Sequence, residues 1–269
     1  MVLVQKINCK SIISKTKISG AEYSINPYVG CEHGCSYCYA RFMRRFSGHK
    51  EEWGQFVDVK INAVSIASRQ LSRLRKGLTL LSSVTDPYQP LEKKYELTRK
   101  LLEKLAMYGF PVSILTKSSL VTRDIDLFKC FQSCSVGMSL TTFDEKVRKK
   151  FEPHSSSVKE RLSALNKLAD ENVNTYVFLG PVLPIVTEKT LIKLVDEIKQ
   201  VNPDYVLIDR LNIKYGNWKL ILQVLKKHYS EDIGFWKSVL FTDSTYYETL
   251  KNTLSSIFDK SGISYHFCY

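Results

Sequence analysis

The chain has 269 residues, of which 44% are hydrophobic and 25% are charged. These proportions are ordinary for a globular protein, and the length fits one large α/β domain or two small ones. No apolar run approaches the length of a membrane span, and residues 1–10 lack the features of a signal peptide, so we expect a cytoplasmic protein with no membrane partner. Seven cysteines, three of them in one short segment, indicate metal chemistry in a reducing compartment rather than a disulfide framework.

The charge balance is strongly basic, at +12 from 39 Lys and Arg against 27 Asp and Glu. This excess favours a polyanionic partner such as nucleic acid, because cationic side chains displace counterions from phosphates. Lysine-rich helix faces that cover a core would explain the charge equally well. The densest basic segments are residues 41–45, 69–76 and 146–150.

The first part of the chain is irregular. Residues 1–22 predict an extended stretch with a short hairpin around Ser19 and Gly20. Alternating apolar and polar residues predict strands at 23–28 and 56–60, and helical patterns cover 40–46 and 63–76.

From residue 78 the pattern becomes regular. It predicts strands at 78–84, 111–115, 136–140, 175–179 and 205–208, and helices at 91–108, 124–131, 158–171 and 188–201. Ser157 and Glu160 form a capping box before the third of these helices. Two further helices, 218–228 and 246–259, and a strand at 263–268 complete the chain.

This alternation is typical of βαβ units and a parallel sheet. It gives six repeats when residues 23–28 are the first strand and 205–208 the sixth, although periodicity does not separate a partial barrel from an open doubly wound sheet. No proline- or glycine-rich linker interrupts the pattern, so we predict one domain, with a core at about 22–212 and an α/β extension at 213–269.

Three cysteines, Cys31, Cys35 and Cys38, lie within eight residues after the first strand. Thiolates at such spacings bind iron–sulfur clusters, and a four-iron cluster held by three cysteines keeps one iron open. Gly30 and Gly34 allow the backbone to bend around a cluster. The alternatives are a zinc loop that lacks one ligand, or buried structural cysteines.

Polar residues follow the later strands, where parallel α/β folds place their chemistry. Thr85 and Asp86 suit a ligand amine, or Asp86 forms an Asx turn. Lys117 suits a carboxylate, or is a solvated surface lysine. Ser139 and Thr141 offer hydroxyls suited to a ribose, although strand propensity also explains threonine there.

The cysteine segment resembles the CxxxCxΦC motif of the radical S-adenosylmethionine (SAM) superfamily, with Tyr37 as the aromatic residue. The motifs at 31–41, 85–90 and 115–118, together with Glu152-Pro153, Arg161 and 179–184, resemble the branch related to spore photoproduct lyase. The resemblance covers about residues 24–212. It implies a partial (β/α)6 barrel of the TIM type, and cleavage of SAM into methionine and a 5′-deoxyadenosyl radical by a [4Fe-4S] cluster.

The resemblance also implies roles for individual residues. Cys31, Cys35 and Cys38 would bind the cluster, and Tyr37 would lie near the adenine of SAM. Lys117 would meet the SAM carboxylate, with ribose contact around Ser139. The other expected cofactor contacts are Thr85, Asp86, Thr141 and Arg161.

One position departs from the branch. Spore photoproduct lyase has a cysteine hydrogen donor at or beside the position of Val84, and this chain has none there. We therefore do not expect repair of the thymine photoproduct, and Tyr88 is the nearest candidate for a catalytic hydrogen donor. Four other cysteines would be the ligands of any second cluster: Cys9, Cys130, Cys134 and Cys268.

Three functions follow. The first is a radical SAM enzyme that abstracts hydrogen from a nucleic acid, with an electron donor such as flavodoxin or ferredoxin. Aromatic residues near the motif would stack on bases: Tyr28, Tyr39, Phe42, Phe46 and Tyr88. The second is the same chemistry on a peptide or small molecule. The third is a non-catalytic iron–sulfur or zinc module that binds nucleic acid.

Overall fold

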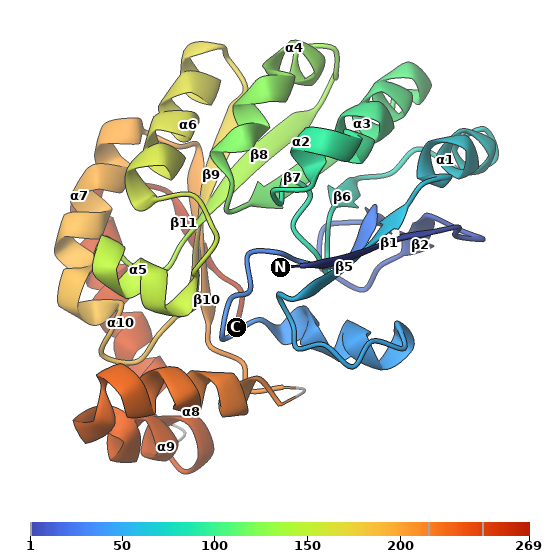
Figure 1. Cartoon of the computed structure of the whole chain (residues 1–269). Helices are drawn as coiled ribbons and strands as arrows, with labels where there is room; N and C mark the ends of the chain where they lie inside the picture. Colours follow the sequence, from blue (N-terminus) through green and yellow to red (C-terminus); the bar gives the residue numbers. More distant parts are fainter. Residues whose placement is uncertain (1, 215, 244) are drawn as a thin grey trace.

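The computed structural model describes residues 2–214, 216–243 and 245–269. An eight-stranded sheet with the order β11-β10-β9-β8-β7-β6-β3-β2 forms its centre. Six neighbouring strands run parallel: β3 (Tyr23–Ile25), β6 (Thr79–Leu81), β7 (Val112–Thr116), β8 (Cys134–Leu140), β9 (Asn174–Val182) and β10 (Tyr205–Arg210). The predicted α/β class and its six repeats are confirmed. Strands β2 and β11 are the two edges of this order, so the sheet is an open barrel (Figure 1).

Helices cover the outer face of the sheet (Figure 1). They are α3 (Leu97–Tyr108), α4 (Ile125–Phe128), α6 (Val158–Asp170), α7 (Leu191–Val201) and α10 (Tyr246–Ser261). Alternate strand residues face these helices, and in β7 those residues, Val112, Ile114 and Thr116, are buried. Ser113 and Leu115 face the inside of the barrel and are only partly buried. The predicted capping box of Ser157 and Glu160 is present at the start of α6.

The first predicted strand divides into two. Its first half is β3, whereas its second half, β4 (Tyr28–Gly30), leaves the main sheet and pairs with β5 (Phe56–Lys60). Pro27 lies between them and has no N–H to continue a ladder. Strand β5 also pairs with β1 (Leu3–Ile7), which gives a separate three-stranded sheet. The predicted hairpin is confirmed, because β2 (Ile13–Lys15) pairs antiparallel with β3 across a turn that contains Gly20 at φ +80°.

Several predicted helices are shorter or divided. The one at 91–108 is interrupted at Glu96, whose φ is +51°, and gives α2 (Glu92–Tyr95) and α3. The one at 63–76 ends early, as α1 (Ala63–Leu71), and 40–46 is a 3₁₀ helix, η1 (Tyr39–Phe46). The helix predicted at 124–131 is η2 (Ser119–Asp124) followed by α4, and α7 is preceded by η3 (Glu188–Thr190). Helix α5 (Glu145–Phe151) was not predicted.

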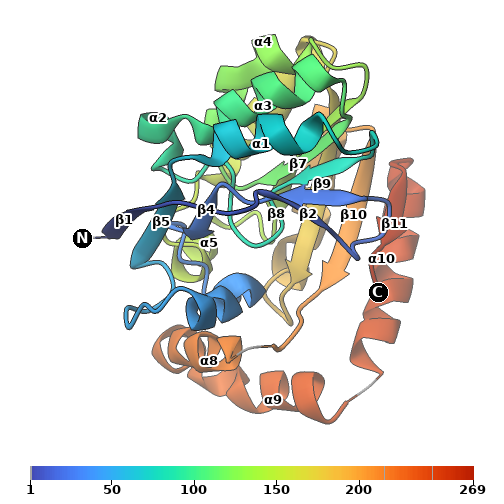
Figure 2. The same ribbon diagram turned by 90° about the vertical axis from the view of Figure 1, so that its right-hand side faces the viewer.

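The C-terminal residues extend the same sheet. After α8 (Asn217–His228), η4 (Ser230–Asp232), α9 (Ile233–Phe241) and α10, strand β11 (Tyr265–Phe267) pairs parallel with β10. Figure 2 shows α8 and α9 beyond the carboxyl ends of the strands, beside the segment that follows the cysteines. Within the described ranges, no helix combines the length and apolar character needed to cross a membrane.

Candidate active site

The cysteine loop follows β4 and is folded by two tight turns. The Gly34 N–H donates to the Cys31 carbonyl over 3.3 Å, and the Cys38 N–H donates to the Cys35 carbonyl over 3.2 Å. Gly54 passes so close that a Cβ on it would lie 2.8 Å from the Gly34 Cα, and its φ is +98°. Only glycine fits that position without strain. The bend predicted at Gly34 therefore depends on a second glycine, twenty residues further along the chain.

The three thiols form one buried group. Cys31 and Cys35 are each 7% exposed, and Cys38 is partly buried. Burial raises the pKa of all three thiols, to about 12 for Cys35, and the neighbouring Asp86, Cys35 and Cys38 raise that of Cys31 further. The thiols are thus close enough to interact electrostatically.

The donor set fits an iron–sulfur cluster, since it offers three soft sulfur ligands in one protected loop. Binding would replace the thiol protons with metal. Among the described residues, no three or more His, Cys, Asp or Glu are grouped to hold one metal ion. The cysteines of a four-iron cluster each bind a different iron and need not converge on one point.

The loop after β6 holds the cysteine loop in place. The Thr85 hydroxyl donates to the Gly30 carbonyl over 2.6 Å. Gln89, which is fully buried, accepts from the Glu32 N–H over 3.0 Å and donates to Thr85 Oγ1 over 3.1 Å. Sequence analysis did not single out Gln89, because its role depends on contacts with residues more than fifty positions away.

Asp86 organises the ends of β6 and β7. Its carboxylate accepts from the Tyr88 N–H, the Thr116 hydroxyl and the Lys117 N–H over 2.6 to 2.9 Å, and His33 Nε2 lies 3.3 Å away. Burial alone would raise the pKa of Asp86, but His33 and the hydrogen bonds outweigh it and lower the pKa to about 2. These protein donors occupy the carboxylate, so Asp86 positions the loops around the site. Its predicted contact with a ligand amine stays a prediction.

A buried ion pair lies under the site. Glu152 and Arg161 are 0% and 1% exposed and form a short, charged hydrogen bond. Glu152 also accepts from the Tyr37 hydroxyl and, over 3.1 Å, from the Thr141 hydroxyl. Burial opposes its ionisation, but Arg161 and Lys117 lower the pKa of Glu152 to about 2. The pair therefore joins the cysteine loop, through Tyr37, to the end of β8.

Lys117 lies beside the cysteine loop, as the resemblance implies. Its ammonium is 5.7 Å from the centre of the Tyr37 ring. Burial opposes its charge, but nearby Cys35 and Glu152 raise the pKa of Lys117 above its ordinary value. Within the described structure, this ammonium has no ion pair within bonding distance and its charge is available to a ligand.

Arg161 and Ser139 are linked at the end of β8. The Arg161 guanidinium donates to the Ser139 carbonyl over 2.7 Å and to the Ser156 carbonyl over 3.0 Å, in addition to its bond with Glu152. Arg161 thus orients the backbone of β8. In the part of the chain that the structure describes, the Ser139 side chain makes no hydrogen bond and is 2% exposed. The structure brings Lys117, Tyr37 and Thr141 together around the ion pair of Glu152 and Arg161.

Tyr88 lies in a different network. Its ring is fully buried, and its hydroxyl donates to Asp124 over 3.0 Å, where Arg123 also binds. Burial and Asp124 raise the pKa of this phenol well above its ordinary value. A hydrogen-donor role for Tyr88 has no support in these contacts. Val84, by contrast, packs against the apolar cluster that contains Cys31, as Cys38 also does, so the position without a cysteine is beside the site.

The four remaining cysteines lie on separate elements. Cys134 begins β8 and Cys268 follows β11, which places them at opposite ends of the parallel strands. Cys130 is exposed after α4, and Cys9 is partly buried before β2. No second-cluster arrangement of these four occurs among the described residues.

Asn217 at the start of α8 is a site residue that sequence reasoning missed. It is fully buried, and its amide donates to the Tyr37 carbonyl over 3.0 Å and to the Asn212 carbonyl over 2.9 Å. Arg41 makes a parallel link, because its guanidinium donates to the Gly216 carbonyl over 3.2 Å. The C-terminal extension therefore holds the cysteine loop directly.

Comparison with known proteins gives the family. The model of the Radical SAM superfamily matches residues 25–198. The chain belongs to the radical SAM superfamily. This result confirms the predicted family and identifies the chain as a radical SAM enzyme, for which the family implies a [4Fe-4S] cluster and SAM.

Three relatives extend the similarity. An uncharacterized protein of Methanocaldococcus jannaschii is 42% identical over 179 residues, covering 66% of this chain and 67% of the relative. One of Mycobacterium tuberculosis is 30% identical over 197 residues, covering 70% of this chain but only 58% of the relative. A radical SAM Nalpha-GlyT isomerase of Pseudomonas phage M6 is 25% identical over 221 residues, covering 81% of this chain and 45% of the relative.

Solved structures share the radical SAM fold. Spore photoproduct lyase complexed with dinucleoside spore photoproduct aligns with a TM-score of 0.73 at 17% identity, covering 99% of this chain and 82% of that one. Streptococcus suis SuiB bound to precursor peptide SuiA aligns with a TM-score of 0.59 at 12% identity, covering 91% of this chain and 48% of that one. The fold predicted from the resemblance is confirmed.

Proposed function

We propose that this radical SAM enzyme abstracts a hydrogen atom from a nucleic acid. One observation supports a SAM site most directly: four features lie together at the cysteine loop, near the ends of the strands. They are the three thiols, the Tyr37 ring, the Lys117 ammonium and the Glu152–Arg161 pair. A cluster held by the three cysteines would supply the electron that cleaves SAM into methionine and a 5′-deoxyadenosyl radical.

The residues of this chain have distinct tasks in that proposal. Cys31, Cys35 and Cys38 hold the cluster, and burial keeps water from it. Lys117 pairs with the SAM carboxylate as a fixed positive charge. Tyr37 places its ring near the adenine, while Glu152 and Arg161 hold that ring and the end of β8 in position. The proposed ribose contacts are Ser139 and Thr141, and Thr85 and Asp86 complete the proposed cofactor pocket.

Three observations favour nucleic acid as the substrate. The net charge of +12 suits a phosphate backbone. The similar structure of spore photoproduct lyase holds a dinucleoside photoproduct. Tyr39 and Phe46 are 47% and 75% exposed beside the cysteine loop and are available to stack on bases, whereas Tyr28 and Tyr88 are buried. Val84 in place of a cysteine argues for a reaction other than photoproduct repair.

A peptide substrate is the second candidate. The structure of SuiB bound to its precursor peptide carries this alternative, because that fold is also similar to this one. Either reaction needs a one-electron donor, and flavodoxin or ferredoxin is the proposed partner. A non-catalytic module is disfavoured, since a binding module would not need Lys117 beside the cysteine loop.

Binding of SAM tests the cofactor site. In anaerobically reconstituted protein, we expect Lys117→Met to weaken SAM binding by about tenfold or more, because it removes one charged hydrogen bond. Isothermal titration would measure this, with the partly exposed Lys104→Met on α3 as the matched control. Equal affinities in the two variants would remove Lys117 from the site.

Isotope transfer tests the substrate. Oligonucleotides and peptides made with deuterium in place of non-exchangeable hydrogen are supplied separately with SAM and reductant. We expect deuterium in 5′-deoxyadenosine only with the oligonucleotides. Deuterium from peptides alone would favour the second candidate and overturn the first.

A further inference from the structure

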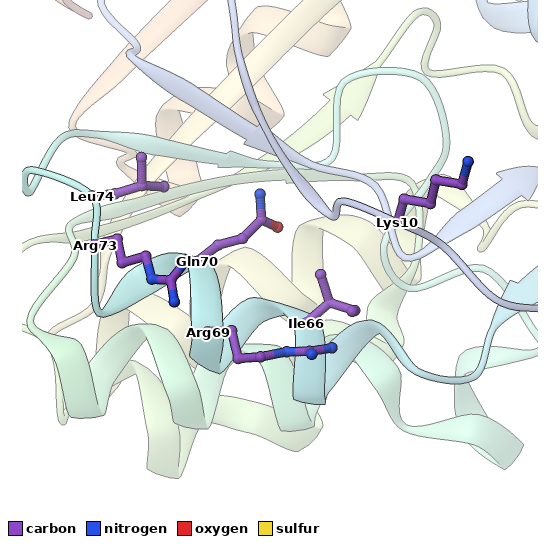
Figure 3. Close-up of a pocket in the computed structure, with 6 residues that line it drawn as sticks. All are labelled: Lys10, Ile66, Arg69, Gln70, Arg73 and Leu74. Carbon is purple, nitrogen blue, oxygen red and sulfur yellow. The ribbon is translucent and has the colours of Figure 1, made fainter.

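A cationic groove lies away from the strand-end site, between the segment before β2 and helix α1. Its cavity of about 370 Å³ is lined by Lys10, Ile66, Arg69, Gln70, Arg73 and Leu74. Figure 3 shows Lys10 on one side, on the segment before β2, and the two arginines on and just beyond α1. The lining contains three positive side chains and no carboxylate.

The three cations have no partners within the described structure. Lys10, Arg69 and Arg73 are exposed, and no ion pair or hydrogen bond joins their side chains to another described residue. The apolar side chains of Ile66 and Leu74 pack against the core beneath them. Charge therefore accumulates at this groove without local neutralisation.

The other two basic segments differ. Near the cysteine loop, Arg41 and Arg44 both pair with Glu52, over 3.2 and 3.6 Å. In the segment at 146–150, Arg148 is buried and pairs with Glu145 over 2.6 Å. These arginines bind other side chains of the protein, whereas the three cations of the groove are available to bind an external anion.

The groove is also rigid, because side-chain amides fasten both ends of the segment that carries Lys10. Asn62 binds the backbone N–H and carbonyl of Cys9 over 2.8 and 3.0 Å. Gln70 accepts from the N–H groups of Ile12 and Ile13 over 2.8 and 3.0 Å. The backbone at Lys10 is thus held opposite α1, which lowers the entropy cost of binding an anion between them.

The groove lies next to one edge of the open barrel. The clamped segment leads into β2, one of the two edge strands of the open sheet. A strand of nucleic acid that enters the open side of the barrel would pass this edge. Phosphodiesters match three unpaired cations, and such contacts position a nucleic acid without reading its sequence.

We propose that the groove of Lys10, Arg69 and Arg73 binds the phosphate backbone of the nucleic-acid substrate outside the catalytic site. This inference rests on the proposed nucleic-acid substrate. It assigns the groove a positioning role, with no part in cluster or SAM binding.

Fluorescence anisotropy with a labelled single-stranded oligonucleotide tests the inference. We expect Arg69→Gln with Arg73→Gln to weaken binding by about tenfold and to lower the slope of log K against log salt by about 1.5, since each lost phosphate contact removes roughly 0.7 to 0.9. Arg69→Lys with Arg73→Lys should retain most of the affinity, because a lysine ammonium also binds phosphate as a point charge.

The matched control is Lys159→Gln with Lys167→Gln. These lysines line a groove of about 300 Å³ that also contains Glu160, and the substitution changes the net charge equally. An equal loss of affinity in this control would show that the effect comes from net charge alone, and it would overturn the proposed phosphate-binding site. Inorganic phosphate or a mononucleotide that binds the groove as tightly as the oligonucleotide would also overturn it, in favour of a small phosphorylated ligand.

Formation of 5′-deoxyadenosine without nucleic acid separates this inference from the proposed function. We expect it to be equal in the wild type and in all of these variants. A wild type that forms 5′-deoxyadenosine but binds no oligonucleotide at low salt would overturn the groove and the nucleic-acid substrate, while SAM cleavage would stand.

Discussion

At the scale of single residues, Glu152 carries the most consequential charge in the site. It is fully buried, yet four protein donors, led by Arg161, keep it ionised. A buried charge whose partner is removed is strongly destabilising. The sequence placed Glu152 and Arg161 in the resemblance to the spore photoproduct lyase branch, but only the structure shows that they bond to each other and to Tyr37.

We expect Glu152→Gln to lower the free energy of unfolding at pH 7 by about 3 to 5 kcal/mol, because Arg161 would lose its buried partner. Urea unfolding measures this loss. The exposed Glu103→Gln is the control and should change the free energy by less than about 0.5 kcal/mol. A loss as small as that of the control would mean that the pair adds nothing to stability.

The same carboxylate makes stability depend on pH. Its pKa in the fold, about 2, is below the ordinary value of 4.5, so its stabilisation is complete above about pH 4.5 and is lost as the pH falls towards 2. We expect the wild type to lose on the order of 3 kcal/mol across this interval through Glu152, and Glu152→Gln to lack that part of the loss. Urea midpoints between pH 7 and pH 2.5 provide the measurement, and parallel curves for the two proteins would contradict it.

At the scale of elements, the cysteine loop depends on backbone packing that side chains do not reveal. Gly54 and Gly48 both have positive φ, at +98° and +72°. A Cβ on Gly54 would meet the Gly34 backbone, whereas a Cβ on Gly48 would meet nothing within 4 Å. Substitutions at these two glycines therefore distinguish the effect of a strained φ from the effect of close backbone approach.

We expect Gly54→Ala to destabilise the protein by several kcal/mol and to lower iron bound per chain after reconstitution, because the cysteine loop must move. Gly48→Ala has only the strain of positive φ and should cost about 1 kcal/mol with unchanged iron. Thermal unfolding and iron analysis test both variants. Unchanged iron content in Gly54→Ala would show that this approach does not shape the loop.

Most elements were predictable, and the failures have physical causes. Periodicity located the five parallel strands from β6 to β10, because their buried faces appear in the sequence as apolar runs. It did not divide β3 from β4, since strands of three residues have too little pattern to show a change of sheet. It also missed the break at Glu96, a residue that rarely adopts positive φ.

At the scale of the whole molecule, the C-terminal extension completes the site. Strand β11 adds to the sheet beside β10, and Asn217 binds the cysteine loop across 180 residues of sequence. No local pattern signals such a contact, because asparagine at a helix start is ordinary in any sequence. The cysteines, Lys117 and the strand ends were predictable from local motifs, whereas the residues that hold them, Gln89 and Asn217, were not.

We expect Asn217→Ala to cost about 1 to 3 kcal/mol, because the Tyr37 carbonyl would lose its buried donor, and to speed the loss of cluster in air. The exposed Asn252→Ala on α10 is the control, expected within about 0.5 kcal/mol of the wild type. Decay of the cluster absorbance measures the second effect. Equal rates of cluster loss in the two variants would show that the C-terminal extension does not stabilise the site.

We infer that the cysteine loop and the strand ends form one SAM-cleaving site. The most direct test is anaerobic reconstitution with iron and sulfide, followed by reductant and SAM, with 5′-deoxyadenosine and methionine quantified by chromatography. We predict both products in equal amounts from the wild type and neither from Cys35→Ala. A fully reconstituted wild type that forms no 5′-deoxyadenosine would contradict the account.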